Sequence, residues 1–169
     1  GTSTLDSVPL NNTGTVQVFT GTLNLNSGGN SSGAFTVNAG AVLQFNSDYT
    51  LNPGATLTGA GLYRLPGGTL TISGTLIVPN FEQTGSTLAG SGTLTVTGAM
   101  TWTEGTQSGS GATTIASGAT LNVNNAFVML DARTLNNAGT VNWTATNQWA
   151  FNNGAVLNRS ERASCRERV

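Results

Sequence analysis

Lysine and histidine are absent from the 169-residue chain, and charged residues of all kinds make up only 8% of it. With no histidine and a single cysteine, the chain lacks the usual ligands of transition metals. The scarcity of glutamate, lysine, arginine and glutamine also removes the residues that favour amphipathic helices. Because no apolar run approaches the roughly 18 residues of a membrane helix, we expect no membrane insertion in this fragment.

What the chain does contain is threonine, asparagine and glycine, with 28, 19 and 23 copies. Threonine is β-branched and favours strands, whereas glycine and asparagine tolerate the positive φ of tight turns. Leucine, valine, isoleucine and phenylalanine recur at regular intervals between them, which argues against disorder. The composition therefore predicts many short strands joined by turns.

One short phrase recurs along the chain: a glycine, a small residue, and then apolar, polar and apolar residues. It reads GTLNL from Gly21, GAFTV from Gly33 and GTLTV from Gly92. Successive glycines of the phrase are separated by 19, 21, 20, 18 and 19 residues; they are Gly14, Gly33, Gly54, Gly74, Gly92 and Gly111. A β-sandwich also has closely spaced strands, but it does not require this steady longer period.

We therefore predict an all-β fold, a single-stranded parallel β-helix (β-solenoid) of about seven to eight rungs of roughly 20 residues. A right-handed coil is expected from the handedness of parallel crossovers. Equivalent apolar residues of successive rungs then stack into a narrow core; among them are Leu23, Phe35, Leu76 and Leu94. Threonine and asparagine either face outward or form side-chain ladders.

The repeats resemble those of bacterial autotransporter passengers and of filamentous-haemagglutinin-like surface adhesins. The phrases that carry the resemblance are GAFTVNAGAVLQF, GGTLTISGTLIV, GSGATTIASGATLNV and RTLNNAGTVNW. The resemblance covers most of residues 14–158 and implies a right-handed β-helix in a secreted or surface-displayed bacterial protein. It supplies no catalytic residue, because these repeats have none to match.

The last eleven residues, RSERASCRERV, depart from the repeat. They hold four of the six basic residues and the single cysteine, Cys165. The peptide RASCRERV resembles a translated sequencing adapter, so we divide the chain into a β-solenoid fragment, residues 1–158, and a non-native or disordered tail, residues 159–169. The alternative is a genuine basic arm. Without the tail the net charge is −3, and no basic patch remains for nucleic acid.

The chain offers few candidates for catalysis. Cleavage of a glycan by acid–base chemistry needs two carboxylates facing one site, and the carboxylates available for this role are Asp48, Glu82, Glu104 and Asp131. Only Glu82 and Glu104 are spaced near one rung, and their offsets from the rung glycines differ. Calcium would need clustered oxygen ligands, which the sequence does not show. We expect no catalysis, no cofactor and no metal site.

Aromatic and threonine residues suggest two further kinds of surface. Tyr63 and Trp149 are the candidate contacts for a glycan, although aromatic residues in phase with apolar strand positions favour a core role. Threonine pairs such as Thr93/Thr95 suggest an ice-binding face, but other rungs break the array, as at Thr75/Ile77.

The favoured function is a structural stalk or adhesin-like segment of a large secreted or cell-surface bacterial repeat protein. The alternatives left open are a carbohydrate-binding β-helix and, less favoured, an ice-binding solenoid or a polysaccharide-degrading β-helix enzyme. Expected partners are surface glycans or other cell-surface molecules. Because end rungs expose unpaired strands, end-to-end self-association is a further expectation.

Overall fold

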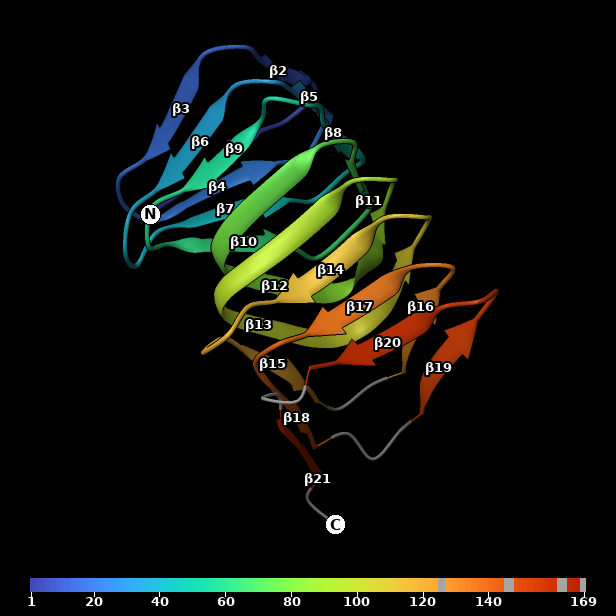
Figure 1. Cartoon of the computed structure of the whole chain (residues 1–169). Coiled ribbons are helices and arrows are strands. Elements are labelled where there is room, and N and C mark those ends of the chain that lie inside the picture. The colour runs from blue at the N-terminus through green and yellow to red at the C-terminus, as the bar shows by residue number, and fades with distance from the viewer. Residues whose placement is uncertain (125–126, 145–147, 161–163, 168–169) are drawn as a thin grey trace.

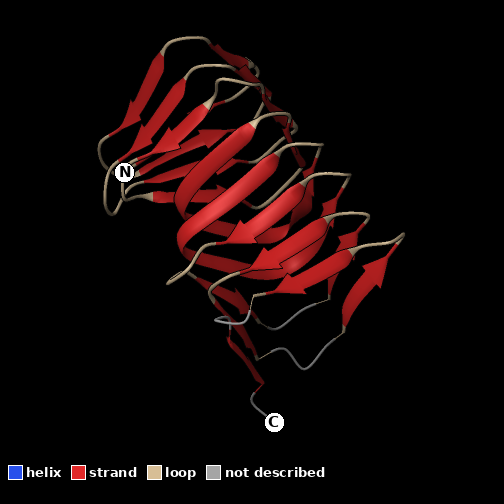
Figure 2. Cartoon of the chain, in the orientation of Figure 1, coloured by secondary structure: helices blue, strands red, loops and turns tan. Residues whose placement is uncertain are grey.

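The computed structural model describes residues 1–124, 127–144, 148–160 and 164–167. All regular structure in these ranges is β-strand (Figure 2). The strands wind into an all-β parallel β-solenoid of about eight turns with roughly 20 residues per turn (Figure 1), which confirms the predicted fold class. The right-handed coil stays a prediction. Within the described ranges there is no helix long and apolar enough to cross a membrane.

Each turn places three strands on three faces, which we call A, B and C. Face A is formed by β1 (Thr2–Leu5), β4 (Thr22–Leu25), β7 (Val42–Phe45), β10 (Leu62–Leu65), β15 (Thr120–Val123), β18 (Thr140–Trp143) and β21 (Ser164–Glu167). Face B is formed by β2 (Leu10–Asn12), β5 (Gly29–Ser31), β8 (Tyr49–Leu51), β11 (Thr69–Ile72), β16 (Val128–Asp131) and β19 (Trp149–Asn152). Face C is formed by β3 (Thr15–Val18), β6 (Ala34–Val37), β9 (Thr56–Thr58), β14 (Ala112–Ile115), β17 (Thr134–Asn137) and β20 (Val156–Arg159).

Two long strands bend across all three faces in the middle of the solenoid, β12 (Thr75–Ala89) and β13 (Thr93–Ser108). Figure 1 shows them as continuous ribbons that wrap the molecule. They pair in parallel along most of their length, with register shifts at the bends, as between Val78 and Asn80. The two strands therefore join the shorter strands above and below them into one 18-stranded parallel sheet, while β3, β6 and β9 form a separate three-stranded sheet on face C.

The register repeats once per turn, so like residues stack along the axis. Leu23 lies opposite Leu43, and Leu43 lies opposite Tyr63. Because side chains alternate across a strand, every second residue points inward, and strands such as β6 and β10 show the alternation as half-buried and buried positions. Phe35, Leu76 and Leu94 are at most 2% exposed. The narrow stacked core predicted from the sequence is confirmed at these positions.

Close contact between turns explains some of the corner glycines. A Cβ added at Gly33 would lie 2.2 Å from the carbonyl oxygen of Gly14, one turn earlier. No side chain fits at that distance, so the corner between faces B and C requires glycine there. Gly92 and Gly111 approach the preceding turn in the same way, at 2.3 and 2.2 Å, so the spacing of the turns accounts for these members of the glycine period.

Amide side chains form ladders on the surface, in line with the repeat. Asn26 donates to Asp6 and Asn46 donates to Asn26, both at 2.6 Å. Other rungs of this kind join Asn30 to Asn11, Asn142 to Asn122, and Asn158 to Asn136. Each bond links two turns and adds to the backbone pairing along the axis.

The described part of residues 159–169 continues the coil. Arg159 ends β20, and Ser164–Glu167 forms β21, which pairs with β18. The rest of residues 161–169 lies outside the described ranges. That residues 159–169 are a non-native or disordered tail stays a prediction.

Candidate functional site

Tyr63, a candidate glycan contact, lies in the core. Its ring is fully buried on β10. The hydroxyl lies 2.7 Å from the carbonyl oxygen of Thr58 and 2.9 Å from that of Phe35, and it donates to these acceptors. Burial raises the pKa of the Tyr63 phenol. The ring offers no face to solvent, so a sugar cannot stack on it in this fold.

Trp149, the other candidate glycan contact, belongs to an aromatic cluster near the C-terminal end of the solenoid. It is 8% exposed. Its ring meets those of Trp102 and Trp143 edge-on, with centroids 5.9 Å apart in both cases. Its phase with the apolar strand positions pointed to a core role, and the packing agrees with that interpretation.

The carboxylates are dispersed around the coil. Asp48 accepts a hydrogen bond from the backbone nitrogen of Thr69 at 2.8 Å. Asp131 accepts one from Nδ2 of Asn153 at 2.6 Å. Asp48 and Asp131 thus each bind a neighbouring turn and help to hold successive turns together.

Glu82 and Glu104 are not brought into register either. Glu82 lies opposite Thr101 on face A, whereas Glu104 lies opposite Thr84 at the bend toward face B. Glu82 is held in an ion pair by Arg64. Glu104 is exposed and has no hydrogen-bond or ion-pair partner among the residues that the structure describes.

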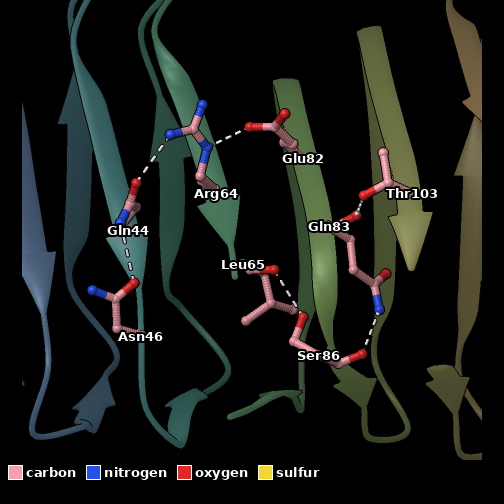
Figure 3. Close-up of polar contacts among 8 residues, drawn as sticks. All are labelled: Gln44, Asn46, Arg64, Leu65, Glu82, Gln83, Ser86 and Thr103. Carbon is pink, nitrogen blue, oxygen red and sulfur yellow. Dashed lines mark hydrogen bonds and ion pairs between the residues drawn. The ribbon is translucent and has the colours of Figure 1, made fainter. Parts of the chain in front are cut away.

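Arg64 lies at the centre of a polar row that crosses three turns of face A (Figure 3). Its Nε pairs with Glu82, and its Nη1 donates to Oε1 of Gln44 at 3.0 Å. The row borders a groove of about 440 Å³ whose lining includes small residues such as Ala60 and Gly61. Arg64 and Glu82 are the two charged residues that line the groove, and they pair with each other.

The outward positions of face C carry no charge up to Asn158. One column reads Thr15, Ala34, Thr56, Thr75, Thr93, Ala112, Thr134 and Val156, and the other reads Gln17, Thr36, Thr58, Ile77, Thr95, Thr114, Asn136 and Asn158. The pair Thr56/Thr58 is a further threonine rung on this face. Alanine, isoleucine, valine and amide residues still interrupt the array, so it does not form a regular lattice.

Arg133 is a buried charged side chain that the sequence did not lead us to expect. It is fully buried, and all five of its N–H donors have acceptors. The Nε donates to Oγ1 of Thr113 at 3.1 Å. The two Nη atoms donate to four backbone carbonyls at 3.0–3.2 Å, those of Gly90, Gly92, Ser108 and Ala112. Burial lowers the pKa of Arg133 to about 10, so the guanidinium remains charged at neutral pH.

Arg133 therefore joins three successive turns from the inside. The side chain occupies space that glycines leave open: a Cβ added at Gly111 would lie 2.9 Å from Nη1 of Arg133. The network continues as Thr113 donates to Gln107 at 2.7 Å and Gln107 donates to Gln83 at 3.2 Å. The one sequence signal for this burial was the placement of Arg133 in the corner column that Gly92 and Gly111 occupy in earlier turns.

Figure 3 shows the other end of this interior chain. The Nε2 of Gln83 donates to the carbonyl of Ser86 at 2.9 Å, and the Ser86 hydroxyl donates to the carbonyl of Leu65 at 2.8 Å. These buried polar groups are satisfied by one another and by the backbone. They leave no donor directed at a ligand.

Comparison of the chain with family models, with curated proteins and with solved structures gave no match. In the described residues there is also no group of three or more histidine, cysteine, aspartate or glutamate side chains that could hold a metal ion.

Proposed function

We propose that the chain is a structural, non-catalytic segment of the stalk of a large secreted or cell-surface bacterial repeat protein, with an adhesin-like role. The observation that carries the proposal is the unbroken parallel pairing from β1 to β21 along face A. Face B is paired without a break from β2 to β19. Eight turns at about 4.8 Å each give a rod of roughly 38 Å.

The side chains support the same role. Amide ladders link turns on the outside, and Arg133 links three turns on the inside. Among the carboxylates that the structure describes, four bind a neighbouring turn: Asp6, Asp48, Glu82 and Asp131. The resemblance of the repeat phrases to autotransporter passengers and filamentous-haemagglutinin-like adhesins agrees with an exported stalk. Secretion or surface display is part of this proposal.

A stalk segment should accept extra turns, and the register supplies a way to add them. Residues 22–61 form two whole turns, because Thr22 lies opposite Val42 and Val42 lies opposite Leu62. Two additional copies of residues 22–61, inserted after Gly61 in the full chain, keep a small residue, glycine or Ala41, before each face A strand. We expect the variant to fold with unchanged β circular dichroism. Small-angle X-ray scattering should show a particle about 19 Å longer, for four turns at about 4.8 Å.

The matched control inserts two copies of residues 22–51, which add one and a half turns each and place face B residues before face A strands. This variant should lose β structure, because the inward residues no longer stack. If the whole-turn insertion unfolds, or if the particle grows in width and not in length, the stalk proposal is wrong.

A further inference from the structure

A hollow of about 330 Å³ lies at the bend between faces A and B, and we call it the corner hollow. Its lining includes one glycine from each of three successive turns, Gly68, Gly85 and Gly105. All three have positive φ, as at Gly105 with φ 96°. With no side chains on these residues, the backbone surface is open to contact from outside.

One end of the corner hollow is formed by Glu104. It is the one carboxylate, among the side chains that the structure describes, with neither a hydrogen-bond donor nor a cation beside it. A Cβ placed on Gly85 would lie 3.6 Å from its Oε2, so the carboxylate extends over the glycine floor. An exposed carboxylate in this position accepts strong hydrogen bonds from hydroxyl groups.

Phe127 lies beside Glu104 in the next turn, since Val128 pairs with Gly105. Its side chain is 48% exposed. Most other large apolar residues with such exposure belong to the end turns, as Phe19 and Phe151 do. An exposed ring and a carboxylate without a partner thus meet at one hollow in the middle of the solenoid.

We propose that the corner hollow binds one ring of a neutral hexose, either alone or as part of a glycan. The aromatic face of Phe127 packs against the C–H face of the sugar, which carries partial positive charge. The Glu104 carboxylate accepts hydrogen bonds from two adjacent sugar hydroxyls. Thr87 and Thr106 line the same hollow and supply hydroxyl groups for the remaining contacts.

The charge of the hollow sets its specificity. Glu104 is its one charged lining residue. A sugar that carries a carboxylate, such as a uronic acid, would place two negative charges close together. The inference goes beyond the stalk proposal, because a rod needs no sugar site, and the sugar site would give the rod a contact of its own.

The test uses the full chain and ligand-observed saturation-transfer NMR. The probes are the methyl glycosides of glucose, galactose and mannose, with methyl glucuronide as the charged comparison. At least one neutral glycoside should bind with a dissociation constant on the order of 1 mM, as suits a ligand of about a dozen heavy atoms in a shallow site. The glucuronide should bind at least tenfold more weakly.

The variants Glu104→Gln and Phe127→Leu should each weaken binding at least tenfold, because Gln keeps the shape without the charge and Leu keeps apolar bulk without the ring. The matched controls are Glu82→Gln, on face A, and Phe19→Ala, an exposed ring in the first turn. Both should bind as the parent chain does, and circular dichroism of each variant verifies its fold.

Three results would overturn the inference: no neutral glycoside binds the parent chain, binding survives both Glu104→Gln and Phe127→Leu, or the controls weaken binding equally. None of these results bears on the stalk proposal, which depends on the insertion experiment. Failure of the one is therefore distinguishable from failure of the other.

Discussion

Replacing Arg133 by methionine tests how far the buried guanidinium holds the solenoid together. Methionine has a similar length and is flexible enough to fill the space, but it donates no hydrogen bond. The substitution removes five bonds that reach Thr113 and the carbonyls of two earlier turns. It also removes a buried charge, and this second effect raises the free energy of unfolding, whereas the loss of the hydrogen bonds lowers it.

The two effects can be compared. Hydrogen bonds to a charged group contribute roughly 1.5–3 kcal/mol each. The low end applies, because the carbonyls of Gly90 and Gly92 keep their bonds from the backbone of the next turn. Five bonds then contribute about 7 kcal/mol. The fall in the pKa of Arg133 from 12.5 to about 10 corresponds to roughly 3 kcal/mol of unfavourable burial, so Arg133→Met should lower the free energy of unfolding by about 4 kcal/mol.

The assay is urea unfolding followed by circular dichroism, with Arg64→Met as the matched control. With a slope of roughly 2 kcal/mol per M, the midpoint of Arg133→Met should fall by about 2 M. Arg64 makes a partly exposed ion pair, so its substitution should cost at most about 1 kcal/mol. If Arg133→Met is as stable as Arg64→Met, the guanidinium does not hold the turns together and the reasoning fails.

Further predictions concern proteolysis, glycine packing and alkaline stability. Trypsin should not cleave early at Arg64, which lies in a paired strand, or at Arg133, which is buried. Mass spectrometry should find the first cleavage at the exposed Arg159 or after it. Early cleavage at Arg133 would contradict its burial. Gly111→Ala should lower the melting temperature, because its Cβ would lie 2.2 Å from a carbonyl oxygen of the preceding turn; an unchanged melting temperature would show that the turns can separate there. Burial raises the pKa of Tyr49 from 10.0 to about 12, so its contribution to stability is intact below pH 10 and is lost as the pH rises toward 12. Arg133 acts oppositely over this range, so Tyr49→Phe isolates the effect: the variant should lose less stability between pH 9 and pH 11 than the parent does.

The solenoid could be predicted from the sequence because glycines that recur about every 20 residues mark its turns. The glycines that precede face C strands at Gly33, Gly92 and Gly111 are required because two turns approach closely there. The alternation that follows them, as in GAFTV, places Phe35 in the core. What the pattern did not show is which bends stay extended: β12 and β13 pass through Gly85 and Gly105 without ending. A local pattern does not distinguish a bend in a strand from a turn between strands.

The burial and the neighbours of individual side chains were harder to predict, because the residues that surround them belong to other turns. Arg133 is charged, and charged residues are seldom buried, yet the open space at Gly111 and Gly92 admits it. Tyr63 was a candidate glycan contact, but it is buried because the register between β7 and β10 stacks it on Leu43 of the preceding turn. Glu104 and Phe127 are more than one turn apart in sequence, and only the pairing of Gly105 with Val128 places them side by side.

Pulling the rod along its axis is the measurement that tests the stalk account most directly. The chain would carry cysteine handles at Thr2 and Asn158, with Cys165 replaced by serine, in a single-molecule force experiment. Thr2 lies in β1 and Asn158 in β20, in the first and the last full turns. Because each turn pairs mainly with its neighbours, the account predicts repeated extensions of roughly 70 Å, the contour length of about 20 residues. Release of the whole chain in one step at low force would contradict it.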